Sequence, residues 1–141
     1  MKTTARTITP SSPSAELYLQ LAQQHGHYCP MSTLGLRLGL EAMRFVDNQG
    51  WSFCYLARTC AVDGLSLALG QTHALKIASR GQHSLICRST AGRELSFSLT
   101  AEALRLAKQY QQLNNDEKQQ QLELLQTVAA EQLIQMTGSA E

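Results

Sequence analysis

The chain has 141 residues, near the commonest size of one domain, with 43% hydrophobic and only 16% charged residues. Its formal net charge is +1 and aromatic residues make up 6%, so it lacks the basic stripe with interleaved aromatics typical of nucleic-acid binding. No apolar run approaches the roughly 20 residues that cross a bilayer, and no apolar signal segment follows Lys2 and Arg6. We therefore expect neither nucleic acid nor membrane insertion, and a cytoplasmic protein whose four cysteines are thiols.

The N-terminal residues 1–14 are polar, with two prolines among serines and threonines, and too little apolar surface to favour ordering. We expect a flexible segment there, followed by one domain over residues 15–141. Apolar positions three and four residues apart predict a first helix from Ser14 to about Gln24, which ends at His25 and Gly26.

A second helix is predicted over residues 32–46, with Gly35 and Gly39 on one face. Glycine in a helix interior costs about 1 kcal/mol relative to alanine, so this pair indicates close approach by another backbone. Residues 51–58 alternate as a strand whose inner face carries Trp51, Phe53 and Tyr55, and residues 60–69 predict a third helix that ends at Gly70.

The second half of the chain predicts three short strands followed by helices. The strands form an antiparallel meander over residues 73–79, 83–89 and 94–99, with glycine turns between them. Two helices follow, the last lined by apolar positions from Leu122 to Met136 in a stripe wide enough for a partner subunit. The predicted class is α+β, with an antiparallel sheet of about four short strands packed with N-terminal and C-terminal helices.

Metal-ligating residue types gather in the segment His25-Gly-His-Tyr-Cys-Pro30. In an extended loop His25, His27 and Cys29 would point to the same side. Imidazole and thiolate suit zinc, nickel, copper or iron rather than calcium or magnesium. The spacing is not that of a zinc finger, so an open site with room for another ligand is favoured over a closed structural one.

A second segment, Cys60-Ala-Val-Asp-Gly64, places a thiol at a helix start and a carboxylate three residues later on the same face. The helix dipole would draw the Cys60 thiol toward thiolate, and Asp63 could meet the same metal or proton. Alone this pattern is weak, because an isolated cysteine in a helix is most often a packing residue. Beside the histidine segment, it suggests one shared site.

These residues also carry a resemblance. The run HGHYCP, the glycine-containing helix LGLRLG, the run CAVDG and the turn GQT together resemble the core of the family of formylmethanofuran dehydrogenase E subunits, from about Leu17 to Leu99. The resemblance implies an α+β core, a metal site formed by the His-x-Cys loop and the later cysteine, and a homodimer. Archaeal members are associated with tungsten or molybdenum formylmethanofuran dehydrogenase, but many bacterial members have no methanofuran pathway, so no reaction is implied.

The sequence departs from the family pattern in three places. Met31 stands where glycine is usual, Gln71 where cysteine is frequent, and His73 in a segment usually richer in glycine. Gln71 removes one candidate thiolate. The cysteine-rich zinc finger that some members append is absent from this sequence.

The site hypothesis has His27, Cys29 and Cys60 as ligands of one divalent transition metal, zinc first, with nickel or iron as alternatives. His25 and Asp63 orient these ligands or complete the coordination. Five further residues are candidates to line a ligand pocket: Tyr28, Arg58, Thr72, His73 and Lys76. Cys54 and Cys87 lie in strand patterns and are predicted to be small core residues.

Three interpretations of function remain open. The first is a metal-dependent domain, enzymatic or accessory to an oxidoreductase, that keeps an open position for a small-molecule ligand. The second is a metal-free thiol enzyme that uses Cys60 or Cys29 activated by a histidine. The third is an interaction subunit of a larger oxidoreductase complex that uses the helical face from Leu122 to Met136.

Overall fold

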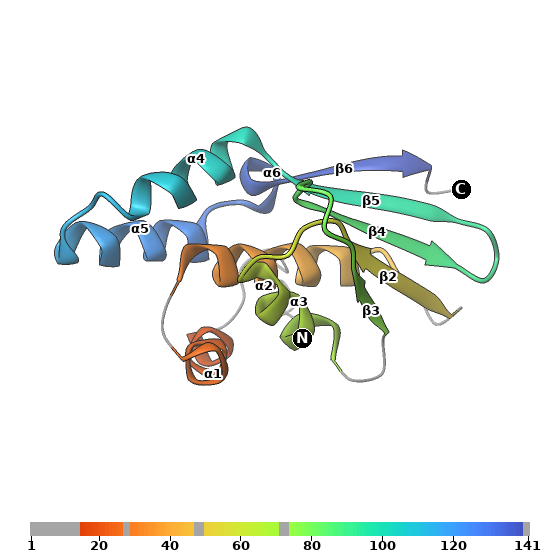
Figure 1. Cartoon of the computed structure of the whole chain (residues 1–141), viewed down its shortest axis with the longest axis horizontal. Coiled ribbons are helices and arrows are strands. Elements are labelled where there is room, and N and C mark those ends of the chain that lie inside the picture. Colours follow the sequence, from red (N-terminus) through yellow and green to blue (C-terminus); the bar gives the residue numbers. More distant parts are fainter. Residues whose placement is uncertain (1–14, 27–28, 47–49, 71–73, 140–141) are drawn as a thin grey trace, which may run out of the picture.

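The computed structural model describes residues 15–26, 29–46, 50–70 and 74–139 of the chain. Six helices and five strands follow one another in this order: α1 (Ala15–His25), α2 (Pro30–Met43), β2 (Trp51–Tyr55), α3 (Ala61–Leu69), β3 (Leu75–Ile77), β4 (Ser84–Ser89), β5 (Glu94–Leu99), α4 (Ala101–Tyr110), α5 (Asn115–Thr127), α6 (Ala130–Leu133) and β6 (Ile134–Ser139). The α+β class is confirmed (Figure 1). The segment expected to be flexible, residues 1–14, lies outside the described residues.

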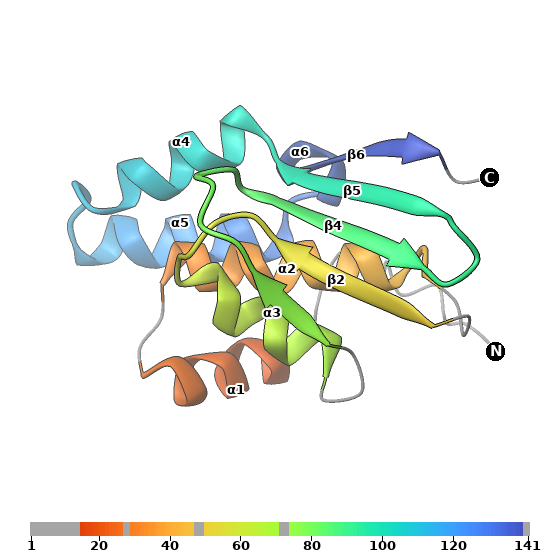
Figure 2. The same cartoon turned by 45° about the vertical axis from the view of Figure 1, so that its right-hand side comes forward.

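The strands form one sheet in the order β3-β2-β4-β5-β6, seen from two directions in Figures 1 and 2. The expectation of about four strands is corrected to five. The meander is right for β4 and β5 but wrong for β3, which pairs parallel with β2 instead of antiparallel with β4. Helix α3 makes this pairing possible, because parallel neighbours need a crossover connection.

The predicted last helix is wrong beyond Thr127. Val128 and Ala129 have extended backbones, and after the short helix α6 the chain pairs as β6 with β5, Ile134 opposite Leu99 and Met136 opposite Phe97. The free edge of β5 supplied a partner that helical periodicity does not reveal. Three members of the expected partner surface, Leu122, Leu125 and Leu133, are buried within the chain.

The main core lies between the helices and one face of the sheet. Trp51, Phe53 and Tyr55 are buried while the residues between them are more exposed, which confirms the predicted inner face of β2. Leu95, Phe97 and Leu99 do the same on β5. Each of α2, α3, α4, α5 and α6 contributes buried side chains to this core. None of the described helices is both long and apolar enough to span a bilayer.

Helices α2 and α3 approach each other through glycine. A Cβ at Gly35 would overlap the backbone of Ala61, and a Cβ at Gly64 would overlap the carbonyl oxygen of Ser32. At Gly39 a Cβ would lie 2.6 Å from the Cβ of Ala68. The close approach predicted from the glycine face is thus made by α3 of the same chain. This face therefore gives no support for a homodimer.

A buried arginine joins α2 to the end of α5. Arg37 is 2% exposed and donates from Nη1 to the carbonyl oxygen of Leu125 (2.8 Å) and from Nη2 to that of Val128 (2.6 Å). Tyr18 of α1 donates to the carbonyl oxygen of Gln126 at 3.0 Å. Burial raises the pKa of Tyr18 to about 12, so the phenol stays a donor at neutral pH. Because a helix C-terminus carries partial negative charge, the guanidinium is well placed there.

We predict that Gly64→Ala destabilises the protein, because the new methyl group would force α3 away from the Ser32 backbone. Overpacking of this kind should lower the free energy of unfolding by roughly 3 kcal/mol, measured by urea denaturation. Ser66→Ala, at an exposed position of the same helix, is the control and should change little. Equal stability of Gly64→Ala and the wild type would contradict the close contact.

Candidate metal centre

Cys29 begins helix α2. It is the N-cap residue, with an extended backbone (φ −155°, ψ 140°), and Pro30 follows in the first turn, where its missing N–H costs nothing. The thiol makes no capping hydrogen bond, and the residue is 8% exposed. Ser32 Oγ donates to the Cys29 carbonyl oxygen at 3.1 Å and so holds this turn.

Cys60 occupies the corresponding place at the start of α3. Its thiol also makes no capping hydrogen bond, since Thr59 Oγ1 accepts from the Ala61 N–H at 3.1 Å instead. Thr59 was expected to cap this helix. Serine, threonine, aspartate and asparagine are the usual N-caps, so cysteine at both positions is locally unfavourable. The glycine contact between the two helices sets these N-termini beside each other.

His25 reaches the same place from the end of α1. Gly26 follows with φ +99° and donates from its N–H to the Ala22 carbonyl oxygen, which ends the helix as a left-handed cap. Nδ1 of His25 lies 2.5 Å from Oδ2 of Asp63, and the His25 side chain is 10% exposed against 51% for Asp63. A proton on Nδ1 donated to Asp63 leaves the lone pair on Nε2.

The structure brings together one ligand atom from each of His25, Cys29 and Cys60, all within 4.8 Å of one another. His25 was expected to point toward the metal from an extended loop, but it does so from a helix. His27, named with Cys29 and Cys60 as a ligand, lies outside the described residues. Asp63 joins the group through His25.

The pKa of the Cys60 thiol is raised. Partial removal from water is the largest cause, although the residue as a whole is exposed, and the neighbouring Cys29 thiol and Asp63 carboxylate add to it. The direction is opposite to that expected from the helix dipole, because these neighbours disfavour a negative sulfur more strongly. The metal-free thiol therefore keeps its proton at neutral pH.

The donor set fits a tetrahedral transition metal. Zinc binds thiolate sulfur at about 2.3 Å and imidazole nitrogen at about 2.0 Å, which places neighbouring ligand atoms roughly 3.5 to 3.8 Å apart. Donor atoms within 4.8 Å of one another need only a small inward movement. A carboxylate on the second nitrogen of a ligating histidine is also the usual arrangement in metal sites.

Tyr110 is a neighbour of this group that the sequence did not single out. It ends α4, and its pKa is raised by burial and then by the charge of the Cys29 thiolate. Nζ of Lys118, in α5, lies 5.4 Å from the centre of the Tyr110 ring. In the sequence Tyr110 fits the apolar stripe of its helix, so no local signal marks it.

The other predicted pocket residues lie apart from the donor group or outside the described part of the chain. Arg58 Nε donates to Ser79 Oγ at 3.4 Å. Lys76 lines a hollow of about 170 Å³ with Cys54 and Arg88. Cys87 is fully buried, as expected, but Cys54 is only half-buried. Three candidates lie outside the described residues: Tyr28, Thr72 and His73.

A family model described as "FmdE, Molybdenum formylmethanofuran dehydrogenase operon" matches residues 24–140. A crystal structure of an FmdE-like protein of tungsten formylmethanofuran dehydrogenase from Syntrophus aciditrophicus has a similar fold, with a TM-score of 0.62 and 15% identity, over 93% of this chain and 74% of that one. No curated protein matches the chain. Because the family match includes both cysteine segments and most of the sequence, the chain belongs to the FmdE family.

Proposed function

We propose that this protein binds a divalent transition metal ion, zinc first, through Cys29, Cys60 and His25, and presents it to a small-molecule ligand. The observation that carries the proposal is the convergence of the three donors within 4.8 Å, with Asp63 on the histidine. His27, two residues before Cys29, stays a candidate for a fourth ligand on sequence grounds. Nickel and iron suit the same donors.

The exposure of the donor group supports an open coordination position. Cys60 is exposed and the side chain of Asp63 is 51% exposed, so a small molecule can approach from solvent. A bound zinc ion would supply Lewis acidity there. Asp63 would orient His25 and strengthen it as a donor, whereas Tyr110 and Lys118 would supply polar groups near the Cys29 side.

We predict that Cys29→Ser and Cys60→Ser each weaken zinc binding strongly. Loss of a group that only orients a ligand costs about 10- to 100-fold in affinity, so loss of a ligand should cost at least about 100-fold, and Asp63→Asn about tenfold. Elemental analysis of untagged protein and competition titration with a chelator measure this. Cys54→Ser, outside the donor group, is the matched control. Full metal occupancy in both ligand variants would remove the thiols from the site.

Zinc affinity should also fall with decreasing pH. Because the pKa of the Cys60 thiol is raised, the metal must displace its proton, and apparent affinity should drop at least about tenfold per pH unit between about pH 8 and pH 6. Titrations at several pH values give this slope, and Cys54→Ser should share it. A constant affinity across the range would mean that binding displaces no proton.

The metal-free thiol enzyme is less well supported. A catalytic thiol needs a lowered pKa, and that of Cys60 is raised. An accessory role beside an oxidoreductase is compatible with metal binding, and the family description, which concerns a dehydrogenase operon, supports it. Four free thiols also suit the cytoplasm, which we propose as the location.

Homodimer formation is a separate proposal, supported by two exposed apolar side chains. Leu124 on α5 is 43% exposed, and Met136 on the edge strand β6 is 40% exposed. We predict that light scattering at micromolar concentration gives twice the mass of one chain. Leu124→Lys or Met136→Lys should shift the protein toward monomer, while Leu19→Lys on α1 should not. A monomeric wild type would contradict the proposal.

A further inference from the structure

The three donors of the proposed site are not held equally. Cys29 and Cys60 begin two helices whose backbones touch at Gly35 and Gly64, and both helices contribute to the main core. His25 ends α1. The position of the third donor therefore depends on how firmly α1 is attached to α2 and α3.

Helix α1 packs through a small cluster of its own. Tyr18 and Leu21 are buried against Leu36 of α2 in a cluster separate from the main core, and Leu19 is 50% exposed. Figures 1 and 2 both show α1 at the margin of the molecule, away from the sheet. Two side-chain hydrogen bonds supplement the apolar contact, Tyr18 to Gln126 at one end and His25 to Asp63 at the other.

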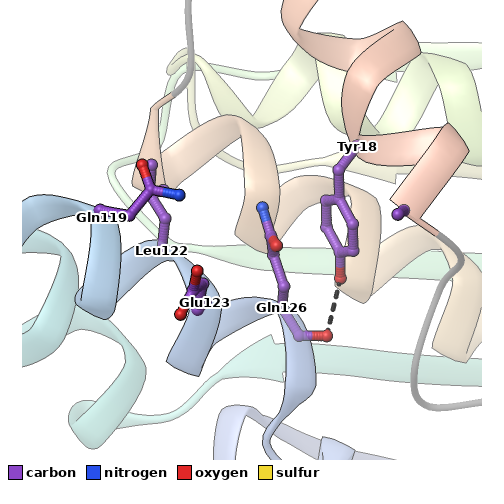
Figure 3. Close-up of a pocket in the computed structure, with 6 residues that line it drawn as sticks. Tyr18, Gln119, Leu122, Glu123 and Gln126 are labelled. Atoms are coloured by element: carbon purple, nitrogen blue, oxygen red, sulfur yellow. Dashed lines mark hydrogen bonds between the residues drawn. The ribbon is translucent and has the colours of Figure 1, made fainter.

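A pocket separates α1 from α5. It measures about 240 Å³ and is lined by Ala15 and Tyr18 of α1 and by Gln119, Leu122, Glu123 and Gln126 of α5. Figure 3 shows the Tyr18 hydroxyl reaching the Gln126 backbone at one side of this space, while the other labelled side chains come from α5. The two helices therefore meet through one hydrogen bond beside a hollow instead of an interdigitated apolar interface.

We propose that α1 is a latch closed by the metal ion: coordination by His25 ties α1 to the α2–α3 pair, and loss of the metal releases α1 and opens the pocket at its other end. This inference rests on the proposed function. A ligand that binds the docked state more tightly shifts the population toward it. An isolated helix of 11 residues is marginal in water, so a released α1 should also lose its helical hydrogen bonds.

Hydrogen exchange on the full chain tests the latch, because amide exchange reports local opening directly. We expect saturating zinc to slow exchange in residues 15–25 at least about tenfold. The β4–β5 hairpin should change much less. Tyr18→Phe should speed exchange of α1 in the metal-free protein, and zinc should reverse most of that increase.

His25→Ala is the decisive variant, with His83→Ala as the matched control. In His25→Ala, zinc held by the cysteines should leave exchange of α1 unchanged, whereas His83→Ala should behave like the wild type. Zinc bound without slower exchange of α1, equal slowing in every element, or full protection in His25→Ala would each overturn the latch while leaving metal binding intact. Absence of bound zinc in the wild type would overturn both proposals.

Discussion

The close contact between α2 and α3 governs the geometry of the candidate site. Gly35 and Gly64 leave no room for a side chain between the two backbones. Two helical glycines cost about 2 kcal/mol in helix propensity relative to alanine, and that cost is acceptable only if close packing returns it. What the contact achieves is positional: two helix N-termini, from segments distant in the sequence, lie side by side with a cysteine at each.

The choice of cysteine as N-cap has an energetic meaning. A thiol is a poor capping acceptor, and here Ser32 and Thr59 perform the hydrogen bonding that stabilises the two turns. Places where a sequence gives up local stability are often functional sites. Both thiols are thereby left to face each other, and their mutual repulsion as anions keeps a proton on Cys60 until a cation replaces it.

This electrostatic arrangement suits a cation better than a nucleophile. Two sulfurs and the Asp63 carboxylate accumulate negative charge at one place, and the helix N-termini offset only part of it. A divalent cation would neutralise the pair of thiolates, while Asp63 would act through His25. The imidazole comes from a helix outside the main core, so the same ion would join an outer element to the most tightly packed part of the molecule.

Local patterns in the sequence were enough to predict the helix and strand types over most of the chain, the inner face of β2, the close approach at Gly35 and the residues able to bind a metal. These features follow from periodicity, from the size of glycine and from side-chain chemistry. The folded chain was needed to reveal the parallel pairing of β3, the conversion of residues 134–139 into β6, the place of Tyr110 beside Cys29 and the hydrogen bond of His25 to Asp63. Each of these depends on which edge, thiol or carboxylate the fold brings near, and residues distant in sequence carry no local signal of that proximity.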